Sequence, residues 1–137
     1  MLRALVAYTS EVYRSKFELM KVNQRLSIKA VMNLVVIEPA DGNLQVDKLW
    51  PQLWAKGKVH PIGADLVDDI YAEYILILEG LLKKSGTTSP RAEALCLLSL
   101  AEGSTIFVVS GRRWEKDSSK VLEKFHEFIA YAYGDDA

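Results

Sequence analysis

The chain has 137 residues, of which 50% are hydrophobic and 26% are charged, a balance typical of one globular domain. At this length folding buries about two-thirds of the surface that the unfolded chain exposes, so no disulfide or structural metal is required. One cysteine and two histidines exclude a disulfide within one chain and a four-ligand Cys/His zinc site. The net charge of −1 argues against the broad basic surface that non-specific nucleic-acid binding needs. We therefore predict a single domain over residues 1–137.

The sequence shows no signal for a membrane or for export. No apolar run reaches about 18 residues, so no transmembrane helix is expected. The N-terminal residues become polar too early for a signal-peptide core and lack a small-residue cleavage pattern. A cytoplasmic protein without membrane partners is the prediction.

Hydrophobic periodicity in the first part of the chain predicts two helices. Apolar residues at helical spacing indicate a long amphipathic helix over roughly residues 2–24. Ser27 then caps a second helix over 28–37. The β-branched residues of this second segment also suit a strand. Helix is favoured because no other segment offers a strand partner and Pro39 ends the run.

Two further helices follow a polar turn. Apolar residues over 46–54 repeat at spacings of three and four and predict a helix with a Trp-rich face. The next helix begins near residue 63 or 64 and extends to about Lys84, where Gly86 supplies a C-terminal stop.

The clearest boundary signal starts the fifth helix. Ser89 is a candidate N-cap, Pro90 suits the first helical position, and Glu93 stands at the capping-box position. This helix is predicted to run to about Val109 and to be buried on more than one side, because it is apolar nearly all round. A last amphipathic helix begins near residues 117–118. The fold class predicted is all-α, a bundle of about six helices.

Residues with catalytic or metal-binding chemistry are few, so we predict no enzyme, no cofactor and no metal. No glycine-rich phosphate loop is present. Cys96 lies in the most apolar segment and is predicted to be a small buried hydrophobe. His60 and His126 have no second metal ligand one turn away and are predicted to be surface or hinge histidines. Three acids at the start of the fourth helix indicate a solvated first turn rather than acid-base chemistry: Asp65, Asp68 and Asp69.

Aromatic pairs on two helices suggest either core packing or a ligand cavity. Trp50 and Trp54 are one turn apart, and so are Tyr71 and Tyr74. Glu102 interrupts an apolar helix, and if buried it needs a partner, a raised pKa or a cationic ligand, whereas an exposed Glu102 needs none. The candidate ligand-binding residues are Asn33, Trp50, Trp54, Tyr71, Tyr74 and Glu102.

The last two helices predict a homodimer. The fifth helix carries more apolar surface than its neighbours in one chain can cover, and the sixth offers a second apolar stripe. Two copies of the pair would bury both stripes as an intersubunit four-helix bundle. The candidate interface residues are Leu98, Ala101, Gly103, Phe107, Val121, Phe125, Phe128 and Ile129.

Two segments carry a family resemblance. The sequence Leu49-Trp-Pro-Gln-Leu-Trp-Ala55, followed by His60-Pro61, resembles the Trp/Phe-rich helix and turn of TetR-family transcriptional regulators. The run Ala94-Leu-Cys-Leu-Leu-Ser-Leu-Ala-Glu-Gly103 is similar to the penultimate helix of that family. The resemblance implies an effector-binding and dimerisation domain that senses a small, mainly apolar molecule. DNA binding would belong to an N-terminal helix-turn-helix domain, which is absent from this sequence.

Two other classes remain open. A standalone helical interaction protein would bind a partner helix on the face assigned to dimerisation and would have a solid core around Trp50 and Trp54. A small helical enzyme has least support, because no nucleophile-base pair or metal set can be assembled.

Overall fold

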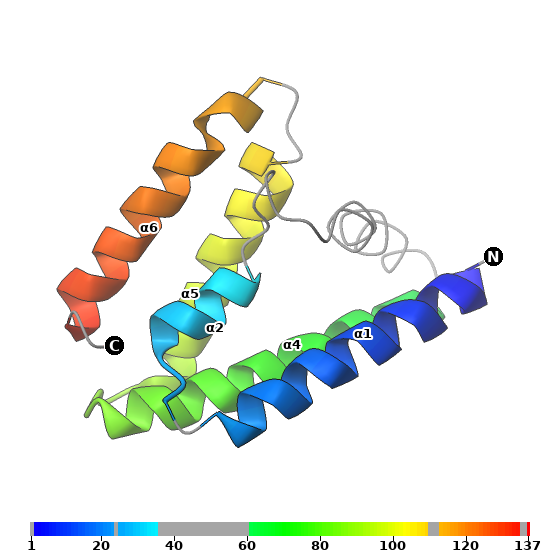
Figure 1. Ribbon diagram of the computed structural model, residues 1–137, viewed down its shortest axis with the longest axis horizontal. Helices are drawn as coiled ribbons and strands as arrows, with labels where there is room; N and C mark the ends of the chain where they lie inside the picture. Colours follow the sequence, from blue (N-terminus) through cyan, green and yellow to red (C-terminus); the bar gives the residue numbers. More distant parts are fainter. Residues whose placement is uncertain (1, 24, 36–60, 110–112, 135–136) are drawn as a thin grey trace. The chain divides into compact units, whose positions relative to one another are not determined.

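The computed structural model describes residues 2–23, 25–35, 61–109, 113–134 and 137. Five α-helices lie in this part of the chain, and no strand does (Figure 1). Their bounds are α1 Leu2–Val22, α2 Ile28–Val35, α4 Pro61–Lys84, α5 Pro90–Gly103 and α6 Ser118–Tyr133. The predicted all-α class is confirmed. The predicted Trp-rich helix, with Trp50 and Trp54, lies outside the described residues.

The helices belong to two compact units. Unit 1 is made of residues 1–25 and 43–74, and unit 2 of residues 26–42 and 75–137. Helix α4 continues from the first unit into the second.

In unit 1, α1 and the first part of α4 lie side by side and run in the same direction (Figure 1). Buried aromatic rings join the two helices. The ring centroids of Phe17 and Tyr74 are 4.8 Å apart in an edge-to-face arrangement, and Tyr13 lies 6.3 Å from Tyr74. Such a pair adds about 0.5–1.5 kcal/mol to the stabilisation from burial alone.

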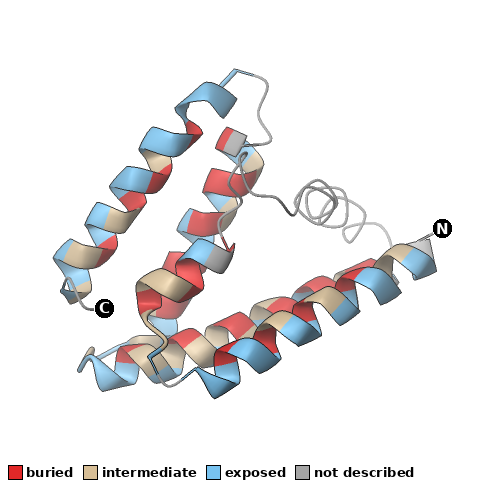
Figure 2. Ribbon diagram, viewed as in Figure 1, coloured by how far each residue is buried: buried red, intermediate tan, exposed pale blue. Residues whose placement is uncertain are grey.

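In unit 2, the short helix α2 packs against α5 and α6, and α6 packs against the segment that follows α5. Figure 2 shows the buried positions of α6 on the side that faces α5 and the exposed positions on its outer side. The core of this unit has no charged side chain among its buried described residues. Its largest fully buried side chains are Met32, Leu78, Leu82, Ile129, Val31 and Thr105.

Two of the predicted helix ends are confirmed. The Ser27 hydroxyl accepts a hydrogen bond of 3.1 Å from the backbone N–H of Ala30, as expected of an N-cap. At the end of α4, Gly86 has a φ of +86°, a backbone conformation that favours glycine. The Gly86 N–H donates to Lys83 at 3.1 Å and the Thr87 N–H to Leu82 at 3.3 Å, which satisfies two free carbonyls of the last turn.

Other predicted ends are corrected. Helix α4 begins at Pro61, two or three residues earlier than expected, because proline is well suited to the first helical position. The acidic residues Asp65, Asp68 and Asp69 are therefore exposed, as expected, but stand beyond the first turn. Helix α5 does begin as predicted, with Ser89 as the N-cap residue and Pro90 at the first helical position, but Ser89 makes no side-chain cap hydrogen bond. The Glu93 carboxylate instead accepts a hydrogen bond of 3.0 Å from the Tyr133 hydroxyl.

The predicted fifth helix is not one uniform helix. It is α-helical to Gly103 and continues as a π-helix over Ser104–Val109. Glycine followed by a run rich in β-branched residues weakens the preference for α geometry at this point. A short 3-10 helix, Glu115–Asp117, then precedes α6.

The prediction that the fifth helix is buried on several sides is wrong for the chain by itself. Cys96, Leu100 and Phe107 are exposed, so the thiol is no core hydrophobe. The residues that α5 buries lie on one side: Ala94, Leu97, Leu98 and Ala101.

Candidate functional site

An apolar groove lies in unit 2. It has a volume of about 600 Å³ and lies between the α5–π-helix segment and α6. We call this side of unit 2 the groove face. The residues that line it are Ser99, Leu100, Gly103, Ser104, Phe107, Val108, Asp117, Lys120, Val121, Lys124, Phe125 and Phe128.

Large apolar side chains stand on the groove face in contact with water. Leu100 is 51% exposed, Phe107 63% and Phe128 60%. Leu100 and Phe107 both line the groove, so they lie on the same side of the segment. These side chains are in water, although full burial of each one would contribute about 1.5–3 kcal/mol of stabilisation.

Small residues leave the groove open between these side chains. Gly103 is exposed, and a Cβ atom placed on it would meet nothing within 4 Å. Ser99 and Ser104 line the groove one turn before Gly103 and directly after it. The face thus offers both protruding rings and a shallow depression beside them.

The positive charges that α6 places at the rim of the groove are paired with negative charges on the same helix. The Lys120 ammonium lies 3.4 Å from the Glu123 carboxylate, and Lys124 lies 2.9 Å from Glu127. The hydrogen bond to Glu127, with its negative charge, raises the pKa of Lys124. Because each lysine has a carboxylate beside it, the rim presents little net charge to an approaching surface.

The predicted dimer-interface residues divide between the groove and the core. Leu98, Ala101 and Ile129 are buried in the chain itself and do not line the groove. Those that line the groove are Gly103, Phe107, Val121, Phe125 and Phe128, with Phe125 buried at its floor.

The predicted ligand-binding residues fall in different units. Tyr71 and Tyr74 belong to unit 1, whereas Asn33 and Glu102 belong to unit 2, where Glu102 is half-buried. Trp50 and Trp54 lie outside the described residues. The cavity that these six residues were expected to line therefore stays a prediction.

Two polar contacts tie α6 to the rest of unit 2. The His126 ring forms a hydrogen bond with the Asn33 side chain on α2, so this histidine and this candidate ligand residue are joined to each other. At the end of α6, Tyr133 donates to Glu93 on α5. Partial burial, reinforced by this hydrogen bond and the negative charge of Glu93, raises the pKa of Tyr133 to about 12.

Comparisons of the chain with models of protein families, with curated protein sequences and with solved structures found no significant match.

No cluster of three or more metal-ligating side chains occurs in the described ranges. None of the helices described here combines the length and apolar content needed to cross a bilayer.

Sequence reasoning missed part of the groove. Leu100 was not among the predicted interface residues, and neither were Ser99 and Lys124. A signal for Leu100 was present, because Leu100, Gly103 and Phe107 follow a spacing of three and four. The lysines gave no signal, since paired charges on a helix are typical of a solvated surface.

Proposed function

We propose that the chain is a homodimeric regulatory domain, of the kind that dimerises and binds a small, mainly apolar effector in TetR-like transcriptional regulators. The groove face is its dimer interface. Any DNA binding belongs to a separate domain outside this sequence, and a cytoplasmic location is part of the proposal.

The observation that carries the proposal is the exposed apolar surface of the groove face. Three large side chains that are more than half exposed lie around one groove: Leu100, Phe107 and Phe128. A contiguous apolar surface rimmed by charged residues is typical of an interaction site rather than of a free protein surface.

A second copy of the chain fits this surface. In a two-fold interface the same patch meets itself, so it must supply both protruding and receding parts. The rings of Phe107 and Phe128 protrude, and the depression at Gly103 recedes. The balanced charges on α6 allow two identical rims to approach without strong repulsion.

Removal of the protruding rings tests the proposal. The double substitution Phe107→Ala and Phe128→Ala is expected to convert the dimer to a monomer in light scattering at micromolar concentration. The matched control is Leu19→Ala, which removes an apolar side chain that is 70% exposed in unit 1. The control should remain dimeric. If the double variant keeps the mass of the parent, the groove face is not the interface.

A groove of this kind also accommodates an amphipathic helix from another protein. In that case the unaltered chain is monomeric by itself, and the parent, the double variant and the Leu19→Ala control all have the mass of a monomer. That result would favour the interaction-module alternative over the dimer.

A further inference from the structure

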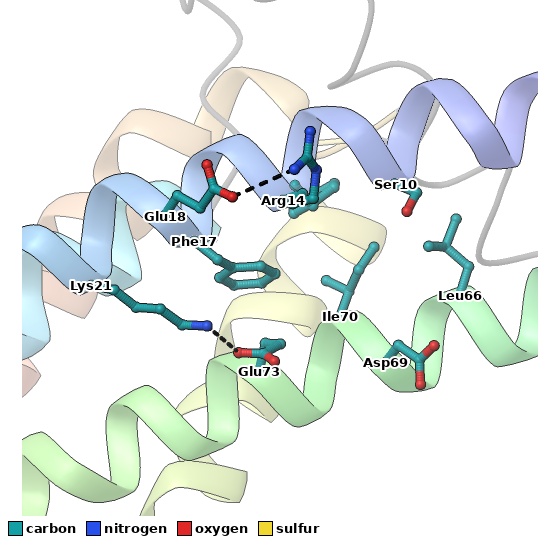
Figure 3. A pocket seen from close by; sticks show the side chains of 10 residues that line it. Ser10, Arg14, Phe17, Glu18, Lys21, Leu66, Asp69, Ile70 and Glu73 are labelled. Carbon is teal, nitrogen blue, oxygen red and sulfur yellow. Dashed lines mark ion pairs between the residues drawn. The ribbon is translucent and has the colours of Figure 1, made fainter.

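A second hollow lies in unit 1, between α1 and the first part of α4, and has a volume of about 280 Å³ (Figure 3). Ser10 and Lys21 line it on α1, and at a rise of about 1.5 Å per residue they are about 16 Å apart along the helix. Figure 3 places Lys21 and Glu73 at one end and Ser10 and Asp69 toward the other. The hollow is thus elongated, with chemically different ends.

Its floor is apolar. Phe17 on α1 and Ile70 on α4 are buried between the helices and contribute to the lining, together with Leu66. A ring or branched alkyl group placed on this floor would be removed from water without desolvating polar side chains.

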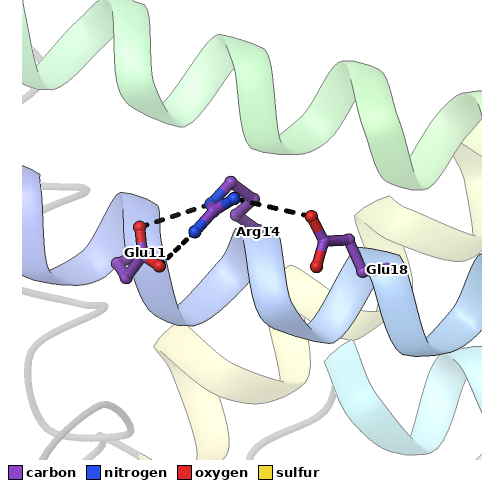
Figure 4. A network of polar contacts seen from close by, with 3 residues as sticks. All are labelled: Glu11, Arg14 and Glu18. Carbon is purple, nitrogen blue, oxygen red and sulfur yellow. Dashed lines mark hydrogen bonds and ion pairs between the residues drawn. The ribbon is translucent and has the colours of Figure 1, made fainter.

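The cations that line the hollow already have partners. The Arg14 guanidinium binds two carboxylates of its own helix, through hydrogen bonds to Glu11 and an ion pair of 3.5 Å with Glu18 (Figure 4). The hydrogen bond and the charge of Arg14 lower the pKa of Glu11, and those of Glu11, with the charge of Glu18, raise the pKa of Arg14. At the other end, the Lys21 ammonium lies 3.6 Å from the Glu73 carboxylate.

One carboxylate of the lining remains without a cation. Asp69 is exposed at the hollow and forms no ion pair with any described residue. The lining contains three acids, Glu18, Asp69 and Glu73, against two cations, Arg14 and Lys21. The unmatched charge is therefore negative, and Figure 3 places it away from Lys21.

We infer that this hollow binds a small monoammonium compound that carries an apolar ring or branched chain. The ammonium group pairs with the Asp69 carboxylate, and the apolar group lies on Phe17 and Ile70. This inference gives a site and a ligand class to the proposed effector. The identification of this ligand as the effector rests on the proposed function, whereas the binding itself does not depend on dimerisation.

Three probes of similar size and different charge test the inference: phenethylamine, 2-phenylethanol and phenylacetate. Each is titrated into the full-length ¹⁵N-labelled chain, and amide shifts are followed by NMR. Ligands with about ten non-hydrogen atoms at an open site bind with a dissociation constant on the order of a millimolar. An exposed ion pair adds a factor of about three to five. The amine should bind most tightly and phenylacetate least, with shifts centred on Ser10, Phe17 and Ile70.

Two substitutions separate the ion pair from general attraction. Asp69→Asn should reduce phenethylamine binding to the level of the alcohol, and Asp68→Asn should leave it unchanged. Asp68 is the matched control because it is exposed on the same helix and does not line the hollow. Both side chains are exposed, so both variants should give folded amide spectra.

Equal affinity of the amine and the alcohol, tightest binding of phenylacetate, or shifts confined to unit 2 would overturn the inference. The mass of each variant in light scattering is recorded in parallel. A dimer that fails to bind the amine contradicts only the inference, and a monomer that binds it contradicts only the proposed interface.

Discussion

The hollow of unit 1 and the groove of unit 2 are both open surfaces between two helical segments, yet their chemistry is opposite. In the hollow, Arg14 and Lys21 form ion pairs within the unit, whereas Asp69 has no ion pair with a described residue. In the groove, Leu100, Phe107 and Phe128 are more than half exposed, although the Phe107 ring stacks on Trp114 at a centroid distance of 6.2 Å.

This difference separates a surface that is stable in water from one whose free energy falls when another surface covers it. Charges at an exposed surface are solvated whether or not they are paired, so the stability of the hollow does not depend on a ligand for Asp69. An apolar side chain exposed to water raises the free energy of the protein in proportion to its exposed area. We therefore expect substitutions in the groove to change association, substitutions behind it to change stability, and substitutions in the charged network to change neither strongly.

The largest expected effect separates the two sides of α6. Ile129 is 1% exposed, and Ile129→Ala should lower the free energy of unfolding by about 2–5 kcal/mol, the cost of a lost core contact and the cavity that it leaves. Phe128 precedes it on the outer side. Phe128→Ala should instead weaken dimerisation, with little change in the stability of the dissociated chain. Urea denaturation at several protein concentrations measures both effects, and equal losses for the two variants would contradict the assignment of sides.

The next prediction concerns the inner side of the π-helix. The Thr105 side chain is 1% exposed, and its buried hydroxyl oxygen has no hydrogen-bond partner among the described residues. Thr105→Val keeps the shape and removes the unsatisfied hydroxyl, so the free energy of unfolding should rise by about 1 kcal/mol. Thr105→Ser is the control, because it keeps the hydroxyl and should lose about 0.8 kcal/mol with the methyl group. A loss of stability in Thr105→Val would mean that the hydroxyl is hydrogen-bonded in solution.

A smaller effect depends on pH. The pKa of Tyr133 is raised from 10.0 to about 12, so the folded protein holds this proton more tightly than the unfolded chain does. The stabilisation is complete below pH 10 and is lost as the pH rises toward 12. After allowance for solvent screening it amounts to about 1 kcal/mol. Ultraviolet titration of the six tyrosines should show one fewer late-ionising group in Tyr133→Phe, and identical titration curves apart from total amplitude would contradict the shift.

The smallest effect is expected in the charged network of unit 1. Arg14→Gln should leave the melting temperature within experimental error, because Glu11 and Glu18 are exposed and remain solvated. The pKa of Glu11 should return upward to its ordinary value, since its depression comes from Arg14. The small stabilisation from this pairing is present above the ordinary pKa and is lost as the pH falls. A carboxyl NMR titration measures the change, and an unaltered Glu11 would show that the pairing does not persist in solution.

Much of the fold could be predicted because local signals and tertiary packing agree. The apolar period of three and four placed α1, α4 and α6, and the cap at Ser27 and the stop at Gly86 depend on nearby backbone groups alone. The π-helix was missed, since its sequence from Ser104 to Val109 continues an apolar helical pattern and only the register of backbone hydrogen bonds distinguishes it.

The candidate sites were predicted less completely, because periodicity identifies an apolar face without showing what covers it. Leu98 and Phe107 both belong to apolar stripes of one segment, yet Leu98 is in the core and Phe107 is in water. The hollow of unit 1 is lined by residues of both α1 and α4, which are far apart in the sequence. Which acid lines the hollow is set by tertiary placement, whereas Asp68 and Asp69 are equivalent in the sequence.

The most direct test of the central claim is the mass of the unaltered chain in sedimentation equilibrium over micromolar concentrations. If the groove face is a dimer interface, the mass should approach twice 15.4 kDa as the concentration rises. A mass that stays at 15.4 kDa throughout this range would contradict the homodimer.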